Sequence, residues 1–323
     1  MKIELILIGG FLGAGKTTFL KNLLSCYEGK KIGVLINEFG RIGIDGKLIA
    51  QTDEHQNDIQ LVEINNGSIF CSCLKGGFIQ ALVKLSQTDI EYLFIENSGM
   101  SDPSNIHQIL KEIACKVDRQ YLYQGAVCIV DSVTFLRHVQ VLAPVQNQIA
   151  SSNLIVINKI DMVNQSTIKE IEEQVHKINP SAFLYETLYS KIPLEVLEEN
   201  LKDNKYIGKT SNQPWNRPAT YSLECDGEFG EQDILDFTNE IVKYSYRIKG
   251  LMKGEGLWWQ LDVVSGSIQL TRANLSKKDV IMISKLVIIG KDTNDFGDII
   301  IKTWEEYFKV KPTVYSDFNL CHK

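Results

Sequence analysis

A short, mostly apolar run near the N-terminus leads directly into a glycine-rich segment, and this pairing constrains the fold more than any other feature. The run is Ile3–Ile8, and residues 9–18 read GGFLGAGKTT. Glycines allow a turn in which several backbone N–H groups point inward, as in loops that bind phosphate. An amphipathic stretch begins near Lys16, so its helix dipole adds positive potential at the same place. The segment therefore predicts a strand, a phosphate-binding loop and a helix in succession.

The spacing of this segment matches G-x-x-x-x-G-K-T, which assigns a role to each residue type. We expect the Lys16 ammonium to reach the β and γ phosphates and the Thr17 hydroxyl to bind Mg²⁺. The predicted phosphate-binding residues are Gly10, Gly13, Ala14, Gly15, Lys16, Thr17 and Thr18. The alternative is a glycine turn that matches by coincidence. The strand before it and the helical pattern after it favour the phosphate loop.

Length, charge and cysteine usage narrow the class of protein. A chain of 323 residues has room for two domains, and its net charge of −6 argues against a general binder of nucleic acid or anionic membrane. No apolar run approaches the about 20 residues that span a bilayer. Seven scattered cysteines do not form a disulfide framework and suit a reducing cytoplasm. We expect Cys26, Cys115, Cys128 and Cys225 to be small core residues.

Short apolar runs alternate with helical patterns up to about residue 200, as at Ser166–Ile178. The predicted strands are Ile3–Ile8, Ile32–Ile36, Gln60–Ile64, Tyr92–Ile95, Ala126–Val130, Leu154–Ile157 and Ala182–Tyr185. This alternation predicts an α/β fold of the P-loop type, with a mainly parallel sheet and helices on both faces. Ligands of such sheets bind at the carboxyl ends of the strands.

The rest of the chain predicts a second, smaller α+β domain. Residues 206–218 are polar, lack periodicity and carry two prolines, so we interpret them as a linker between residues 1–205 and 219–323. The predicted strands beyond it are Ala219–Cys225, Arg247–Met252, Leu257–Val264, Ser267–Thr271 and Leu286–Ile289, and the predicted helices are Glu231–Tyr244 and Thr293–Phe308. Gly266 is placed for a tight turn.

An N-K-x-D motif, made by Asn158, Lys159 and Asp161, follows the apolar run Leu154–Ile157. Such an aspartate accepts two hydrogen bonds from guanine, whereas adenine offers no such donor pair and is rejected. We therefore expect guanine nucleotides, GTP and GDP. The alternatives are that Asp161 caps a helix, or that the phosphate loop serves an ATP-dependent kinase.

Acidic residues follow two other predicted strands. Glu96 can hold Mg²⁺ or orient the attacking water, and the Gly99 N–H can face the γ-phosphate in a loop that switches. Glu38 and Asp45 lie in the segment after the second strand and are candidates for metal contact. We therefore expect Asp45 and Glu96 to act with Lys16 in catalysis.

Cys71 and Cys73 stand two apart, so in an extended segment their thiolates point the same way and can share a soft metal ion. Two thiolates do not complete a tetrahedral site, and Glu38 or a histidine must supply more. The alternative is an incidental C-x-C.

Taken together, these motifs resemble the CobW-like family of GTPases, which includes cobalamin-synthesis proteins and metallochaperones. The matching elements are GGFLGAGKTT, NEFG…ID, NG-x-I-x-C, IENSGMSDP, CIVD, NKID and RIKG. The resemblance implies slow GTP hydrolysis and delivery of zinc or cobalt to a metalloprotein or corrinoid-related client. It also implies a nucleotide-dependent homodimer.

The sequence departs from the family pattern at its cysteines. Ser68 and Phe70 stand where the first two thiols of C-x-C-C would align, and a histidine-rich tract is absent. The competing hypothesis is therefore a metal-independent regulatory GTPase that recruits a client protein.

Overall fold

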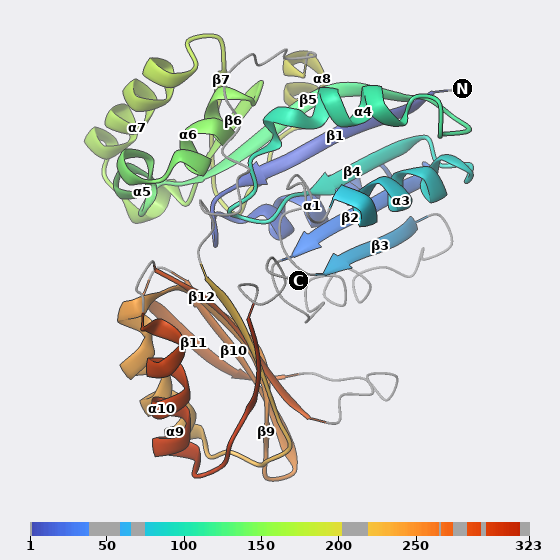
Figure 1. Cartoon of the computed structure of the whole chain (residues 1–323). Helices are drawn as coiled ribbons and strands as arrows, with labels where there is room; N and C mark the ends of the chain where they lie inside the picture. Colours follow the sequence, from blue (N-terminus) through green and yellow to red (C-terminus); the bar gives the residue numbers. More distant parts are fainter. Residues whose placement is uncertain are drawn as a thin grey trace. The chain divides into compact units, whose positions relative to one another are not determined.

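The computed structural model describes residues 2–38, 59–65, 75–201, 219–264, 266–273, 283–291 and 295–316 (Figure 1). The described residues form two compact units, one up to residue 201 and one from residue 219 onward. The predicted linker at 206–218 lies outside the described residues, so the domain boundaries stay a prediction.

The first unit is built on a seven-stranded, fully parallel sheet in the order β3-β2-β4-β1-β5-β6-β7. Its strands are β1 (Ile3–Gly10), β2 (Ile32–Glu38), β3 (Ile59–Asn65), β4 (Tyr92–Glu96), β5 (Tyr121–Asp131), β6 (Leu154–Asn158) and β7 (Phe183–Thr187). All seven predicted strands are present, and β5 begins five residues before the predicted start. The parallel sheet that the sequence predicts is confirmed.

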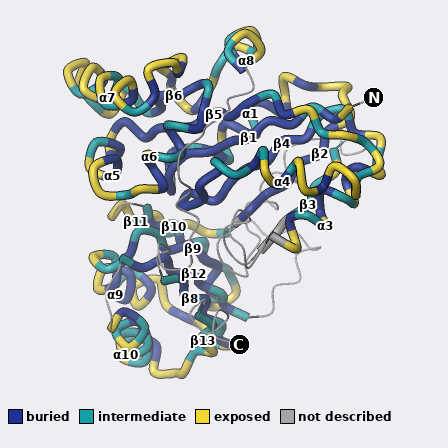
Figure 2. The backbone as a smooth tube through the Cα atoms, turned by 45° about the horizontal axis from the view of Figure 1, so that its top comes forward, coloured by how far each residue is buried: buried dark blue, intermediate teal, exposed yellow. Residues whose placement is uncertain are grey.

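Helices cover both faces of this sheet. They are α1 (Lys16–Cys26), α3 (Lys75–Ser86), α4 (Ile106–Ile113), α5 (Phe135–Val141), α6 (Ala143–Ala150), α7 (Gln165–Ile178) and α8 (Leu194–Asn200), with short 3-10 helices η1 (Pro103–Asn105) and η2 (Ile160–Met162). Alternate side chains of β1 enter opposite cores: Ile8 packs with α1 and α8, whereas Leu7 packs with α3 and α4. Figure 2 shows the central strands buried and the outer sides of the helices exposed.

The second unit is an antiparallel six-stranded sheet in the order β11-β10-β9-β12-β8-β13. Its strands are β8 (Thr220–Cys225), β9 (Ser245–Gly254), β10 (Leu257–Val264), β11 (Ser267–Arg272), β12 (Ser284–Gly290) and β13 (Thr313–Ser316). Its helices are α9 (Glu231–Ile241), η4 (Val242–Tyr244) and α10 (Phe296–Phe308). The predicted α+β class is confirmed. The sequence did not indicate β13, and the predicted helix Glu231–Tyr244 ends in a 3-10 turn.

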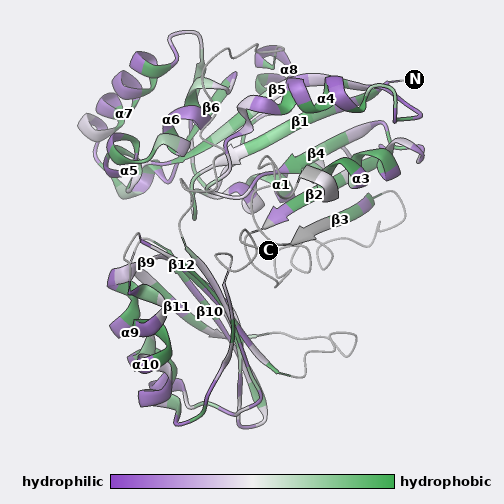
Figure 3. Cartoon of the chain, viewed as in Figure 1, coloured by the Kyte–Doolittle hydropathy of each residue, from purple (hydrophilic) through white to green (hydrophobic). Residues whose placement is uncertain are grey.

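The core of the second unit lies between its sheet and its two helices, where Phe237, Phe296 and Trp304 are completely buried. Figure 3 shows mostly hydrophobic residues along β1, β4 and β5 of the first unit and a mixture of hydrophobic and hydrophilic residues along the strands of the second. Gly250 lets β9 approach β12, since a Cβ there would lie 2.2 Å from the Lys285 carbonyl oxygen. Gly266 has the positive φ of +92° that its turn requires.

Two cysteine predictions are wrong. Cys26 and Cys115 are exposed, whereas Cys128 and Cys225 are buried as expected. Cys26 is the last residue of α1, and Cys115 lies in the turn after α4, so the sheet covers neither. Among the described residues, no helix is long and apolar enough to cross a membrane.

Candidate nucleotide site

The glycine-rich segment forms a tight loop between β1 and α1, because its glycines adopt conformations that other residues disfavour. Gly10, Gly13 and Gly15 have φ angles of +130°, +74° and +110°. A Cβ at Gly10 would lie 2.3 Å from the Ile129 carbonyl oxygen, and one at Gly15 would lie 2.6 Å from both Asn158 Nδ2 and Ser190 Oγ. The loop is therefore closed against β5 and β6, and only glycine fits at these two positions.

Lys16 and Thr17, which the motif assigns to phosphate and Mg²⁺, are the first two residues of α1. The side chain of Lys16 is buried and folds back over the loop, with Nζ donating to the Phe11 carbonyl at 3.0 Å. Thr17 Oγ1 donates to Glu96 Oε1 at 2.8 Å. Glu96 ends β4 and is only 4% exposed, so the sheet places this carboxylate beside the threonine that the motif assigns to magnesium.

The loop after β4 lies against the phosphate loop. The Asn97 N–H donates to the Ile8 carbonyl at 2.9 Å, which extends the pairing of β4 with β1. A Cβ at Gly99 would lie 2.5 Å from the Leu12 backbone nitrogen. The structure thus brings Gly99 next to the phosphate loop, and its contact with the γ-phosphate stays a prediction.

The N-K-x-D residues are tied to the same loop. Asn158 Nδ2 donates to the Ala14 carbonyl at 2.9 Å, and Lys159 Nζ donates to the Gly13 carbonyl at 3.0 Å. Asp161 is exposed within η2. It is the N-cap of neither η2 nor α7, whose N-caps are Lys159 and Asn164, so the helix-cap alternative is wrong. Of the other predicted phosphate contacts, Ala14 is buried and Thr18 is exposed on α1.

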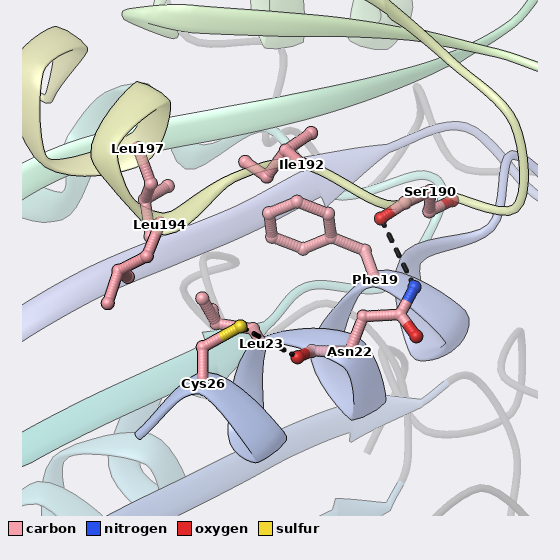
Figure 4. A pocket seen from close by; sticks show the side chains of 8 residues that line it. All are labelled: Phe19, Asn22, Leu23, Cys26, Ser190, Ile192, Leu194 and Leu197. Carbon is pink, nitrogen blue, oxygen red and sulfur yellow. Dashed lines mark hydrogen bonds between the residues drawn. The ribbon is translucent and has the colours of Figure 1, made fainter. Parts of the chain in front are cut away.

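Sequence reasoning missed Ser190, in the loop after β7. Its N–H donates to Asn158 Oδ1 at 2.9 Å, and its hydroxyl donates to the Gly15 carbonyl at 3.1 Å. Asn22 of α1 donates to the carbonyls of Tyr189 and Ser190, which fixes this loop to the helix (Figure 4). Tyr189 and Ser190 both have positive φ, where a turn signal would have been glycine, so no local pattern marks this loop.

Behind this loop, Figure 4 shows a small pocket between α1 and α8. It is lined by Phe19, Asn22, Leu23, Cys26, Ser190, Ile192, Leu194 and Leu197. None of these side chains is charged, and most of them are apolar.

Sequence reasoning also assigned no role to Asp131 and Ser132, which lie at the end of β5. Asp131 Oδ2 accepts a hydrogen bond from Lys159 Nζ at 2.8 Å, and Ser132 Oγ donates to the Lys159 carbonyl at 2.7 Å. The signal that marked Glu96, an acidic residue after a buried strand, applies equally to Asp131.

The sequence assigns a transferred metal to Glu38, Cys71 and Cys73. Asp45, Cys71 and Cys73 lie outside the described residues, as does the side chain of Glu38, whose backbone ends β2. Within the described part of the chain, no group of three or more His, Cys, Asp and Glu side chains could hold a metal ion.

Comparison with known families agrees with this geometry. The model of the CobW/HypB/UreG nucleotide-binding domain matches residues 4–186. The chain belongs to this family. The family resemblance drawn from the motifs is therefore confirmed, and the first unit is its nucleotide-binding domain.

One individual relative extends the similarity into the second unit, because its match is longer than the first unit. The chain is 30% identical to zinc-regulated GTPase metalloprotein activator 1 of Dictyostelium discoideum, over 80% of this chain and 63% of that protein. It is 31% identical to the zinc chaperone YjiA of Escherichia coli, over 63% of this chain and 65% of that protein. It is 28% identical to the zinc chaperone CobW of Pseudomonas aeruginosa, over 61% of this chain and 59% of that protein. The chain thus spans 59% to 65% of the length of these relatives.

Proposed function

We propose that this chain binds and hydrolyses GTP in the cytoplasm and couples its nucleotide state to delivery of a metal ion or metallocofactor. The observation that carries the GTPase part is the contact between Thr17 Oγ1 and Glu96 Oε1 beside a phosphate loop that the N-K-x-D residues hold. The residues proposed to contact phosphate, magnesium and the base thereby lie at one edge of one sheet.

The phosphate chemistry follows from the groups present. The Lys16 ammonium neutralises charge on the transferring phosphoryl group, and a phosphate oxygen can replace the Phe11 carbonyl that it now binds. A hydroxyl and a buried carboxylate 2.8 Å apart are the oxygen donors that Mg²⁺ prefers, so Thr17 and Glu96 would hold it, with Asp45. When bound, the ion withdraws charge from the phosphate oxygens. Glu96 or Asp45 orients the attacking water.

Residues of the loop after β6 select the base. The Asp161 carboxylate accepts the two guanine donors, and adenine leaves it unpaired. Asn158 uses its amide to hold Ala14 and Ser190, so it positions the base site relative to the phosphates as well as facing the base.

The metal part of the proposal rests on the relatives named zinc chaperones and on the sequence motif. Cys71, Cys73 and Glu38 would bind zinc or cobalt on a segment between the two loops that sense the γ-phosphate. Hydrolysis would then change the exposure of the ion to a metalloprotein or corrinoid-related client, with a homodimer as the nucleotide-bound form.

The hydrolysis is tested with Lys16→Ala. Removing the ammonium from the phosphate site should lower the rate of phosphate release from GTP by about 100-fold or more. The matched control is Lys21→Ala, which removes another lysine of the same helix α1 and should keep the wild-type rate. An unchanged rate in Lys16→Ala refutes the assignment, and faster turnover of ATP than GTP supports the kinase alternative.

The metal delivery is tested by titrating the reduced protein with Co²⁺ under anaerobic conditions, with GDP or a non-hydrolysable GTP analogue. We expect cobalt–thiolate charge-transfer absorption that depends on the nucleotide and vanishes in Cys71→Ser/Cys73→Ser. The control Cys26→Ser/Cys115→Ser removes two exposed thiols and should keep the absorption. Absence of a thiolate signal in every nucleotide state favours the regulatory GTPase without metal.

A further inference from the structure

The loop that follows β4 is held from behind by two neighbouring amides of α6. Gln148 Nε2 donates to the carbonyls of Gly99 and Ser101, at 3.1 and 2.8 Å. Asn147 Nδ2 donates to Asp102 Oδ2 at 2.8 Å, and Asp102 in turn accepts from the Ser104 N–H at the start of η1. One turn of α6 therefore fixes both the backbone and the end of the loop.

Gln148 makes the stronger constraint because it binds the loop backbone itself. Both of its acceptors are carbonyls, so the amide must present its NH₂ end to them. The side chain is 1% exposed, so water cannot take over these bonds when they break. Its Oε1 has no hydrogen-bond partner among the described residues, so Nε2 makes the contacts between Gln148 and the loop.

Gly99 is confined from the other side by the phosphate loop. A Cβ at this position would approach the Leu12 nitrogen to 2.5 Å, so the two backbones are in contact at this point. The Gly99 N–H belongs to the peptide that follows Ser98, and the carbonyl of that peptide accepts from the Ser101 N–H at 2.9 Å. Gln148 holds the Ser101 carbonyl, so it reaches the Gly99 N–H through the turn from Ser98 to Ser101.

We propose that Gln148 is a positioning residue for recognition of the γ-phosphate. By holding the Gly99 and Ser101 carbonyls, it fixes the turn from Ser98 to Ser101 and thereby keeps the Gly99 N–H directed at the terminal phosphate of a nucleoside triphosphate. Any shift of the loop must also move or break these two hydrogen bonds. A change at the γ-phosphate is therefore transmitted to α6. This inference rests on the proposed GTP binding and deepens it, because it assigns discrimination between triphosphate and diphosphate to a residue outside the nucleotide motifs.

The substitution Gln148→Met removes both donated bonds and keeps the length of the side chain. The readout is the affinity for a non-hydrolysable GTP analogue relative to GDP, each measured by equilibrium titration with Mg²⁺. We expect the preference for the analogue to fall by about 10-fold while GDP binding is unchanged, because GDP lacks the phosphate that the loop contacts. A purely structural role would weaken both nucleotides together.

The matched control is Gln146→Met, on the same helix. Gln146 Nε2 donates to the Val139 carbonyl of α5 at 2.7 Å and not to the loop, so its loss should leave the ratio unchanged. A wild-type ratio in Gln148→Met, or an equal loss for both nucleotides, overturns the inference while GTP binding stands. A wild-type protein that binds no guanine nucleotide overturns the proposed function and this inference together.

A measurement on the wild-type protein covers the case in which Gln148→Met does not fold. Hydrogen exchange in the peptide spanning α6 should be slower with the GTP analogue than with GDP, because an ordered loop holds Gln148. Equal exchange in the two complexes overturns the inference.

Discussion

At the scale of single residues, Gly10 illustrates how the phosphate loop depends on the absence of a side chain. Its φ of +130° disfavours any L-residue, and a Cβ would also collide with the Ile129 carbonyl. We expect Gly10→Ala to lower the free energy of unfolding of the first unit by about 3 kcal/mol or more, measured by urea denaturation.

Gly29 distinguishes the two causes of that loss, which are backbone strain and steric collision. It has a φ of +78°, but a Cβ added there would meet no atom within 4 Å, so Gly29→Ala retains the backbone strain without the collision. The cost there should be about 1 kcal/mol. Equal costs at the two positions would contradict the close approach of β1 to β5.

The site residues that could be predicted are those fixed by a motif or by a strand end. Lys16 and Thr17 follow from the spacing of the loop, and Glu96 from its place after an apolar run. Ser190 could not be predicted, because its role comes from contacts with Gly15 and Asn158, which are distant in sequence. Gln148 is hidden for the same reason: in the sequence it is one polar residue in an amphipathic helix.

At the scale of elements, one ion pair joins the ends of β5 and β6 to the phosphate loop. Lys159 Nζ binds both Asp131 Oδ2 and the Gly13 carbonyl, and Asp131 is 6% exposed. In Asp131→Asn the ammonium loses its carboxylate and no longer holds Gly13 firmly. We expect a loss of about 2 kcal/mol in unfolding free energy.

Nucleotide binding gives a second readout of this pair. Gly13 lies in the loop that GDP and GTP share, so Asp131→Asn should weaken both by the same factor in equilibrium titrations. The control is Asp89→Asn, which breaks the exposed pair of Asp89 with Lys31 and should change neither stability nor affinity. A change confined to the GTP analogue would assign the pair to γ-phosphate recognition instead.

The elements themselves were predictable where hydrophobic periodicity was strong. Buried parallel strands such as β6 appear as uninterrupted apolar runs, and α7 shows its apolar face at Ile168, Ile171 and Val175. The edge strand β13 could not be predicted, because it is four residues long and none of its side chains is fully buried. Its pairing with β8 is a tertiary contact that no local pattern encodes.

At the scale of the whole molecule, the two units have separate cores, and the described part of each contains one buried cysteine. Cys128 lies in β5 of the first unit and Cys225 in β8 of the second. Burial raises the pKa of the Cys128 thiol to about 12, and burial likewise raises the pKa of Cys225. Only thiolates react with alkylating reagents, so at pH 8 these two thiols react when their unit opens, whereas Cys26 and Cys115 react at once.

This difference turns alkylation into a test of whether the nucleotide stabilises one unit or both. A ligand at 100 times its dissociation constant adds about 2.7 kcal/mol to the free energy of unfolding of the unit that binds it. The population of the open form, and with it the rate of labelling of a buried thiol, then falls by about 100-fold. We expect a GTP analogue with Mg²⁺ to slow labelling of Cys128 by that factor and to leave Cys225 unchanged, as followed by mass spectrometry of the peptides. Parallel slowing of both thiols would mean that the two cores unfold as one cooperative unit. Because Cys26 and Cys115 need no opening, their constant rates would show that the nucleotide does not act on the reagent itself.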